Sequence, residues 1–363
     1  MTEQNGDFAF LPLGGTGEIG MNLNLYRLGE TWLAIDCGIG FSGNDTPEAE
    51  ILVPDPTFIV ERRDQLAGLV ITHAHEDHIG AVAHVWPLLQ CPVYVTPFAG
   101  SVLRRKLGEA RLLNEVPIHV IPCGGTFDVG PFNLEFIPVT HSVPEAQSVV
   151  LRTPHGIVVH TGDWKLDPEP LVGPPTDIKR LKEVGDEGVL ALVCDSTNVM
   201  KPGPSQSEGE VRRSLTELIG SLKGRIAVTC FASNVARVES IAMAAQAAGR
   251  TVVLVGRSLR NLDVSARECG YLSGVLPFLN EQDVNDLPDD QVVMIITGSQ
   301  GEPRSALSRI SLDIHPNISL GEGDTVIYSS RMIPGNERAI MAVQDNLSRR
   351  GVRVITDREH FVH

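Results

Sequence analysis

The chain has 363 residues, of which 42% are apolar, and a formal net charge of −15. This length and apolar content allow a sizeable core and favour two domains, while the acidic balance argues against a general nucleic-acid binder. No charged segment precedes an apolar one near Met1 and no run of eighteen apolar residues occurs, so the sequence predicts a cytoplasmic protein without a secretory signal or membrane span.

The first motif along the chain is Gly15–Gly20, which satisfies the G-x-G-x-x-G pattern of dinucleotide-binding proteins. That fingerprint requires a helix after the glycines. Residues 22–26 instead alternate apolar and polar side chains, which predicts a strand. We therefore expect a tight hairpin here and no NAD or FAD site. The next predicted strand, Trp32–Ile35, ends at Asp36.

The densest cluster of ligand-type residues follows the apolar run Leu69–Ile71 and contains His73, His75, Asp77 and His78. In an extended segment the first two histidines point to the same side. The last two residues of the cluster must then turn away, which suits a second metal beside the first. Imidazole and carboxylate groups are the ligands that Zn²⁺ prefers in catalytic sites. A solvated, histidine-rich loop is the alternative explanation, and the context decides between the two.

Two later strands supply that context, because Phe136–Thr140 ends at His141 and Gly156–Gly162 leads to Asp163. With the strands that end at Asp36 and at the histidine cluster, four strands converge on one edge. Two divalent cations there would share a water molecule, lower its pKa and polarise the substrate. The sequence thus predicts metal-assisted hydrolysis without a Ser or Cys nucleophile. The cluster alone leaves open whether an ester, a lactam or a phosphodiester is cut.

A second α/β domain is predicted in the other half of the chain. The apolar run Val189–Cys194 ends at Asp195, and a Pro- and Gly-rich link follows at 201–205. Ser207 and Glu210 have capping-box spacing ahead of a helix, and the alternation of strands and helices after them predicts a mostly parallel sheet. The expected strands are 225–230, 251–255, 291–296 and 324–329, and the expected helices start at Val235, lie near Leu262 and span 336–350.

The loops after these strands are rich in Gly, Ser and amide side chains, which offer donors suited to phosphates. Taken singly, each is more simply an ordinary turn. In open parallel sheets, however, ligands bind outside the C-terminal ends of the strands. The loops are Ser233–Asn234, Gly256–Ser258, Gly298–Pro303 and Ser330–Glu337.

Scattered basic residues and cysteines add weaker evidence. Each basic cluster is better explained as a solvated face than as an RNA contact. The clusters are Arg104–Lys106, Arg212 with Arg213, Arg257 with Arg260, and Arg304 with Arg309. The six cysteines lie mostly in or beside apolar runs without a C-x-x-C pair, which predicts reduced, buried thiols.

With these residues in place, the chain resembles the metallo-β-lactamase superfamily, whose α/β fold is a four-layer αββα sandwich. The resemblance implies that Asp36 orients the ligand loop by hydrogen bonds and that Asp77 also takes part in catalysis. His160 would be structural or would support a ligand, and His84 would be neither ligand nor catalyst. The implied ligands are His73, His75 and His141 for the first metal, Asp77 and His78 for the second, and Asp163 as the bridge.

The strand-end loops of the second half, with Gly14–Asn22 and Asp195–Asn198, resemble the ribonuclease J family and its β-CASP insertion over essentially the whole chain. This resemblance implies a zinc-dependent ribonuclease with two Zn²⁺ ions, whose metal-activated hydroxide attacks RNA between two domains. It implies 5′-to-3′ exonuclease and endonuclease activity in RNA maturation and decay, and a homo-oligomer at full length. Asp195 matches an acidic residue that orients a catalytic histidine, and Ser233 and Asn234 lie where substrate phosphate could be held.

The expected organisation is a metallo-β-lactamase domain over 1–204, an inserted β-CASP domain over 205–350, and the start of a return into the first domain over 351–363. Family members continue with Ser-Gly-His and His-Gly-Glu stretches, which supply the histidine partnered with Asp195 and a further ligand of the second metal. This chain stops at His360–His363. We therefore expect a truncated chain with an incomplete second half of the sandwich, one histidine missing from the second site and an exposed apolar sheet face. His363 is not expected to replace that histidine.

Two alternative functions stay open. A small-molecule hydrolase, such as a lactonase or thioesterase, would use the same ligands but would not need the loops between Asp195 and Glu337. A non-catalytic or partner-dependent RNA-binding fragment is the second alternative, because a C-terminal ligand is missing. Metal content and cleavage of 5′-monophosphorylated RNA, compared with a lactone and a thioester, would separate the three.

Overall fold

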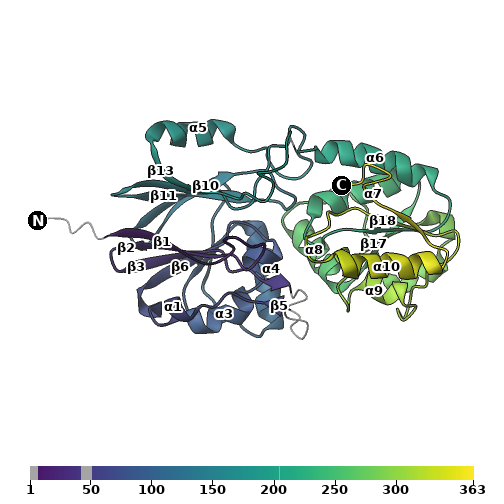
Figure 1. The fold of residues 1–363 in the computed structure, drawn as a ribbon, viewed down its shortest axis with the longest axis horizontal. Helices are drawn as coiled ribbons and strands as arrows, with labels where there is room; N and C mark the ends of the chain where they lie inside the picture. Colours follow the sequence, from purple (N-terminus) through teal and green to yellow (C-terminus); the bar gives the residue numbers. More distant parts are fainter. Residues whose placement is uncertain (1–6, 42–50, 204) are drawn as a thin grey trace, which may run out of the picture. The chain divides into compact units, whose positions relative to one another are not determined.

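The computed structural model describes residues 7–41, 51–203 and 205–363. It divides into two compact units, residues 1–205 and 206–363, termed the first unit and the second unit. Both units contain sheets flanked by helices, so the predicted α/β class is confirmed (Figure 1).

The first unit contains a six-stranded sheet in the order β1-β2-β3-β6-β7-β8. Neighbours among β1, β2 and β3 are antiparallel, whereas β3, β6, β7 and β8 run parallel. The antiparallel pairing of β1 with β2 makes the Gly15–Gly20 segment a hairpin connection, so the predicted hairpin is confirmed. The strands are β1 (Phe8–Gly14), β2 (Leu23–Leu28), β3 (Thr31–Ile35), β6 (Leu66–Val70), β7 (Val93–Val95) and β8 (Ile118–Val120).

A five-stranded sheet of the first unit has the order β13-β12-β11-β10-β9, antiparallel except for the parallel pair of β12 and β13. Its strands are β9 (Thr126–Val129), β10 (Phe132–Pro138), β11 (Gln147–Thr153), β12 (Gly156–His160) and β13 (Val189–Val193). A short ribbon is formed by β4 (Gly40–Phe41) and β5 (Ile51–Leu52).

The two large sheets of the first unit pack face to face and bury one apolar layer between them (Figure 1). Tyr26, Leu33 and Val70 from the six-stranded sheet meet Phe132 and Phe136 from the five-stranded one. Helices cover the outer faces, with α5 (Ile178–Glu187) on one side and α1 (Thr57–Val60), α3 (Val82–Leu89) and α4 (Pro97–Glu109) on the other (Figure 1). The result is the predicted αββα layering.

The strand β13 is the least protected element of this sandwich. It stands at the end of its sheet and pairs with β12. Leu190 and Leu192 are 58% and 61% exposed, although leucine in a strand is normally packed against a neighbouring layer. An exposed apolar surface, as expected from the sequence, is therefore present at this edge.

The second unit is built on a six-stranded sheet in the order β16-β15-β17-β14-β18-β19, in which every neighbouring pair is parallel. The strands are β14 (Ile226–Thr229), β15 (Thr251–Val255), β16 (Leu279–Asn280), β17 (Val292–Ile296), β18 (Thr325–Tyr328) and β19 (Arg353–Ile355). The helices are α6 (Glu208–Ser221), α7 (Val235–Ala247), α8 (Arg257–Glu268), α9 (Ala306–Ser311) and α10 (Glu337–Arg349). The capping box of Ser207 and Glu210 is present at the start of α6.

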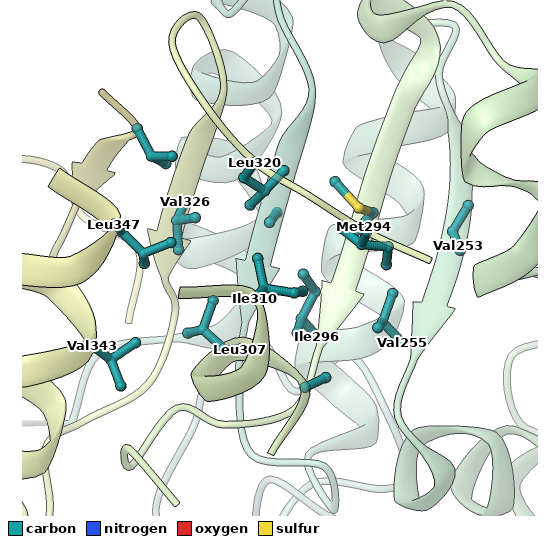
Figure 2. Packing of buried hydrophobic residues seen from close by; sticks show 14 of the residues in the cluster. Val253, Val255, Met294, Ile296, Leu307, Ile310, Leu320, Val326, Val343 and Leu347 are labelled. Carbon is teal, nitrogen blue, oxygen red and sulfur yellow. The ribbon is translucent and has the colours of Figure 1, made fainter. Parts of the chain in front are cut away.

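Apolar side chains fill the space between this sheet and the helices α9 and α10. Figure 2 shows Val253, Met294 and Val326 on the strands facing Leu307 and Leu347 on the helices. These residues are almost completely buried. Parallel strands are covered on both faces, which explains why they read as continuous apolar runs in the sequence.

A buried ion pair joins the second unit's first helices to its last residues. The Arg237 guanidinium donates to both carboxylate oxygens of Glu208, at 2.8 and 3.0 Å. It also donates to the carbonyl oxygens of Ser329 and Val362, at 2.8 and 3.0 Å. The two charged side chains are only 3% and 7% exposed, so the pair ties α6, α7, the end of β18 and the C-terminal segment into one polar cluster, termed the Arg237 cluster.

Residues 351–363, expected to begin a return into the first domain, lie in the second unit. The strand β19 extends the second unit's sheet by parallel pairing with β18, and Val362 is held by Arg237. His363 also lies in the Arg237 cluster, with Nδ1 3.2 Å from an Arg237 guanidinium nitrogen. The segment stays with the second unit because β19 continues that unit's sheet. A strand of three residues is too short for the sequence pattern to reveal this pairing.

The cysteine prediction was partly wrong. Cys37, Cys91 and Cys230 are buried, but Cys123 and Cys194 are exposed, Cys194 because it follows the exposed strand β13. No disulfide joins the six cysteines, all of which lie in the described ranges. Among the helices that the structure describes, none combines the length and the apolar character needed to cross a bilayer.

Candidate metal centre

Four strand ends of the first unit place ligand-type side chains close together. Asp36 follows β3, the 72–78 segment follows β6, His141 lies three residues beyond β10, and Asp163 lies three residues beyond β12. Two of these strands belong to each sheet, so the site lies where both sheets of the sandwich end. After β6 an extended 71–75 segment leads into the short helix α2 (Glu76–Ile79), which carries Asp77 and His78 away from that segment.

A first group of ligand atoms comes from His73, His75, His141 and Asp163, all within 4.8 Å of one another. His75 Nδ1 lies 3.0 Å from His141 Nε2, and Asp163 Oδ2 lies 3.6 Å from His141 Nε2 and 4.0 Å from His73 Nε2. Four ligands at Zn–N distances of 2.0–2.1 Å in a tetrahedron are about 3.4 Å apart. The observed separations bracket that value.

A second group consists of Asp77, His78 and Asp163. His78 Nε2 lies 3.2 Å from Asp163 Oδ1 and 3.5 Å from Asp77 Oδ2. Asp163 therefore directs Oδ2 at the first group and Oδ1 at the second, which is the arrangement of a carboxylate that bridges two cations.

One buried atom supports the fit of a cation to the first group. His73 is 1% exposed, and within the described parts of the chain its Nε2 has no hydrogen-bond partner. A buried polar atom without a partner costs free energy, so native proteins rarely keep one without a reason. The Nδ1 atom of the same ring lies 2.9 Å from Thr72 Oγ1, which leaves Nε2 as the free lone pair. Three imidazole nitrogens and one carboxylate oxygen, at these separations, fit a divalent metal ion.

Asp36 orients His78 directly and His73 through Thr72, in line with the hydrogen-bonding role that the resemblance implied. It is fully buried, and Oδ1 accepts the Thr72 backbone N–H at 2.8 Å. Oδ2 lies 2.7 Å from His78 Nδ1, and the Thr72 hydroxyl that contacts His73 also reaches Asp36. Asp36 has a φ of 63°, in the left-handed region that is uncommon for residues other than glycine. Strain of this kind persists only where the surroundings enforce it.

The charge state of the first group favours metal binding. Burial lowers the pKa of His75 to about 3 and that of His141 to about 4. Burial and the neighbouring His78 also hold the pKa of His73 well below its ordinary value. At neutral pH these rings are uncharged and offer lone pairs.

The second group behaves in the opposite way. Burial disfavours the charged form of His78, but Asp163, Asp77 and Asp36 outweigh it and raise its pKa. Burial also opposes ionisation of Asp163, yet the His78 charge and hydrogen bond keep the pKa of that carboxyl low. Burial raises the pKa of Asp77. The carboxylates of Asp163, Asp77 and Asp36 thus favour a positive charge in the second group. A proton on His78 or a metal ion can supply that charge.

The ligand segment is packed tightly onto the turn after β3. A Cβ atom at Gly38 would lie 1.6 Å from the Asp77 carbonyl oxygen, so only glycine allows this approach. Asn22 donates its side-chain N–H to the same carbonyl at 2.9 Å. On α4, Lys106 donates to both carboxylate oxygens of Glu76, at 2.6 and 2.7 Å. The ligand segment is therefore fixed from three sides.

Three other predicted site residues lie outside the two ligand groups. Asp195 is partly exposed; its N–H donates to Thr161 Oγ1, and its Oδ1 accepts the Thr197 N–H. Asn234 is buried, and its Oδ1 accepts the Arg237 N–H as the cap of α7. Only the amide NH₂ of Asn234 is then suited to a phosphate. Ser233, partly buried, precedes it in the loop between β14 and α7.

Two of the second-unit loops considered for phosphate, Gly298–Pro303 and Ser330–Glu337, are hydrogen-bonded to each other. The Gln300 amide donates to the Arg331 carbonyl oxygen at 2.8 Å and accepts the Ile333 N–H at 2.9 Å. A Cβ at Gly301 would lie 2.6 Å from the Ala339 backbone. Close packing against α10 explains this glycine without any ligand.

His160 and two of the basic clusters make contacts within the protein that account for them without a ligand. His160 is buried, with Nδ1 3.1 Å from the Tyr26 hydroxyl, and His84 is exposed on α3. Of the basic clusters, Arg212 pairs with Glu239 and Arg260 with Glu281, the latter at the surface.

Sequence reasoning missed three side chains at the metal centre: Thr72, Asn22 and Ser142. Ser142 Oγ lies 3.1 Å from His75 Nε2. Thr72 and Ser142 each adjoin a predicted ligand in sequence, which is the signal that could have found them.

Comparison with known proteins agrees with this geometry. A family model described as a beta-lactamase superfamily domain matches residues 31–177, and one described as the ribonuclease J beta-CASP domain matches residues 223–347. A crystal structure of a protein of unknown function from Enterococcus faecalis V583 has a similar fold, with a TM-score of 0.61 at 16% identity, covering 96% of this chain and 88% of that one. The layered first unit and its paired ligand groups define a member of the β-lactamase superfamily.

Curated relatives narrow the class. A ribonuclease J from Sinorhizobium meliloti is 48% identical over 364 residues, covering 99% of this chain and 64% of that protein. Ribonuclease J proteins from Mycolicibacterium smegmatis and Thermus thermophilus are 43% and 38% identical, covering 99% and 97% of this chain. The chain belongs to the ribonuclease J family, and its second unit is the β-CASP domain. It spans 64%, 64% and 63% of the length of these three relatives.

Proposed function

We propose that this chain carries the metal centre and the β-CASP domain of a two-metal ribonuclease that hydrolyses RNA phosphodiester bonds. The observation that carries the proposal is Asp163, whose two carboxylate oxygens face two separate groups of ligand atoms. Ribonuclease J relatives of the chain supply the substrate class.

The proposed ligands are assigned to two ions according to the two groups of ligand atoms in the structure. His73, His75 and His141 would hold the first ion, Asp77 and His78 the second, and Asp163 both. Zinc is the proposed metal, because three imidazoles and a carboxylate are a zinc donor set. When bound, the two ions would lower the pKa of a shared water and stabilise the charge on the phosphoryl oxygens.

The chain's own side chains would prepare this site in three ways. The lowered pKa values of His75 and His141 keep their nitrogens unprotonated at neutral pH. Asp36 and Thr72 fix the ring of His73. Asp77, a proposed ligand of the second ion, would also take part in catalysis, as the family resemblance implies.

Three further roles complete the proposal. Asp195 would orient a histidine, as its family counterpart does, and Ser233 and the Asn234 amide would hold a substrate phosphate. A combined 5′-to-3′ exonuclease and endonuclease activity and a cytoplasmic site of action stay predictions, as does assembly into a homo-oligomer at full length.

Incubation with a 5′-monophosphorylated RNA, beside a lactone and a thioester, tests the proposal. Zinc and manganese are supplied in turn, and the Sinorhizobium meliloti relative is the positive control. We expect metal-dependent release of nucleotides from RNA that His75→Ala abolishes. Hydrolysis of the small esters alone would refute RNA as the substrate. Two ions per chain by mass spectrometry would support the ligand assignment, and fewer than one would contradict it.

If RNA is bound and not cut, the chain is an RNA-binding fragment. A version lengthened at its carboxyl end by the additional segment of the relative distinguishes the cases. Cleavage that returns with that segment would show that the fragment lacks catalytic residues, whereas continued inactivity would count against the metal centre itself.

A further inference from the structure

The three histidines of the first ligand group do not present the same ring nitrogen. His73 offers Nε2, since its Nδ1 lies 2.9 Å from Thr72 Oγ1 and Nε2 has no partner among the described residues. His141 also directs Nε2 at the group, 3.6 Å from Asp163 Oδ2. His75 is reversed: its Nδ1 lies 3.0 Å from His141 Nε2.

The reversal of His75 leaves its Nε2 atom on the far side of the ring. Ser142 Oγ lies 3.1 Å from that atom, within hydrogen-bond distance. A neutral imidazole carries one proton, and the nitrogen that carries it cannot bind a metal. A ring held by an acceptor at Nε2 therefore keeps its Nδ1 lone pair available.

We propose that Ser142 is a positioning residue that accepts the His75 Nε2–H and so selects Nδ1 of His75 as the metal-binding nitrogen. Metal-binding histidines commonly donate their second nitrogen to such an acceptor, and losing it typically costs 10–100-fold in metal affinity. Thr72 serves His73 in this way and Asp36 serves His78. Ser142 completes the set for His75.

The position of Ser142 also couples two ligands. It follows His141 directly in the chain, so the strand end that delivers one ligand supplies the group that orients another, 67 positions away from Ser142. A rotation of the His75 ring would break the Ser142 contact and separate Nδ1 from His141 Nε2 at the same time. The inference depends on the proposed metal centre but not on RNA as the substrate.

Zinc affinity of the purified full chain, measured by competition with a chromophoric chelator, tests this role. We expect Ser142→Ala to weaken zinc binding about 10–100-fold and Ser142→Thr, which keeps a hydroxyl, to lose less than Ser142→Ala. Ser221→Ala is the control, because it removes a hydroxyl of an exposed serine that donates to the Leu218 carbonyl oxygen in the second unit. It should leave zinc affinity unchanged.

A spectroscopic measurement separates positioning from general stability. In the zinc-loaded parent, long-range ¹H–¹⁵N spectra of labelled histidine should show His75 protonated at Nε2, and Ser142→Ala should weaken or broaden that signal. Equal zinc affinity in Ser142→Ala and the parent would overturn the proposal, as would His75 protonated at Nδ1. A metal-free Ser142→Ala protein that melts far below the parent would overturn it too, by assigning the hydroxyl a structural role. Failure of the parent to bind any metal would instead refute the proposed function.

Discussion

The strand ends of the two units use polar residues in opposite ways. In the first unit, side chains from four strand ends point at one another and leave a buried nitrogen of His73 without a partner. In the second unit, comparable residues bond to their own backbone: Asn234 caps α7, and Gln300 joins two loops. The unpartnered His73 nitrogen lies within a group of other ligand atoms, whereas Asn234 and Gln300 use their polar atoms to join segments of the scaffold. The grouping of ligand atoms marks the cation site, since among the described residues Thr229 Oγ1 at the end of β14 and Tyr328 OH at the end of β18 also lack a partner but have no such group around them.

The largest effect should come from Asp163→Ala, which removes the carboxylate shared by both ligand groups. We expect loss of both ions and a fall in RNA cleavage of about 10³-fold or more, since metal ions supply several kcal/mol of charge stabilisation. Mass spectrometry measures the metal content, and a nuclease assay measures the rate of RNA cleavage. Glu302→Gln is the control, because it changes a partly buried carboxyl in the loop after β17 of the second unit and should leave metal content intact.

Breaking the Arg237 cluster should instead destabilise the second unit alone. Arg237→Met leaves the Glu208 carboxylate buried without its partner, and removing one partner of a buried pair costs about 3–5 kcal/mol. All three tryptophans, Trp32, Trp86 and Trp164, lie in the first unit. In urea, the unfolding transition of the second unit should move to lower urea concentration when followed by circular dichroism. The transition followed by tryptophan fluorescence, which reports on the first unit, should stay where it is.

The comparison within the second unit is Arg212→Met, at a partly exposed pair, which should cost no more than about 1 kcal/mol. The double variant Arg237→Met with Glu208→Leu should regain much of the lost stability, because no charge is left buried. Equal shifts in both optical signals would show that the units do not unfold separately.

Asp36→Asn should weaken metal binding about 10–100-fold, because a neutral amide holds the His78 ring less well than a carboxylate. Asparagine tolerates the left-handed backbone of this position better than most residues. Chelator competition measures the affinity. Because asparagine accepts this conformation, the backbone at position 36 should be retained in the variant. Unchanged metal affinity would show that the charge of Asp36 is not needed to orient the His78 ring.

A smaller effect is expected for His160 on acidification of the metal-free protein. Burial lowers its folded pKa to about 4, below the unfolded value of about 6.5. The unfolded chain then binds the proton first, so the His160 contribution is complete above pH about 6.5 and is lost as the pH falls towards 4.

Between these limits the free energy of unfolding should depend on pH by at most about 1.4 kcal/mol per unit for this residue. Replacement by Gln should remove that portion of the slope seen by tryptophan fluorescence. His84→Gln, on an exposed helix surface, should leave the slope unchanged.

The sequence predicted the features that are local. The strand before His73 and the parallel sheet of the second unit are contiguous apolar runs, and the hairpin at Gly15–Gly20 follows from the alternation after it. The convergence of His73 with Asp163 was also predicted, from ligand-type residues at the ends of successive strands, although the two strands belong to different sheets.

What the sequence could not reveal depends on distances between segments far apart in the chain. Ser142 meets His75 across 67 positions, and Arg237 meets Val362 across 125. Asn234 was considered only as a phosphate contact, although an Asn three residues before Arg237 at a helix start is also a preferred N-cap. Cys194 was expected to be buried because it ends an apolar run, but that run is the exposed strand β13.

The contact between Gly38 and the Asp77 carbonyl has a consequence for sequence variation. Codon randomisation at position 38 should return glycine almost alone among variants that retain function, since any β-carbon would displace the backbone of two proposed ligands at once. A residue with no side chain, no charge and no ligand atom thereby becomes one of the least replaceable positions of the protein.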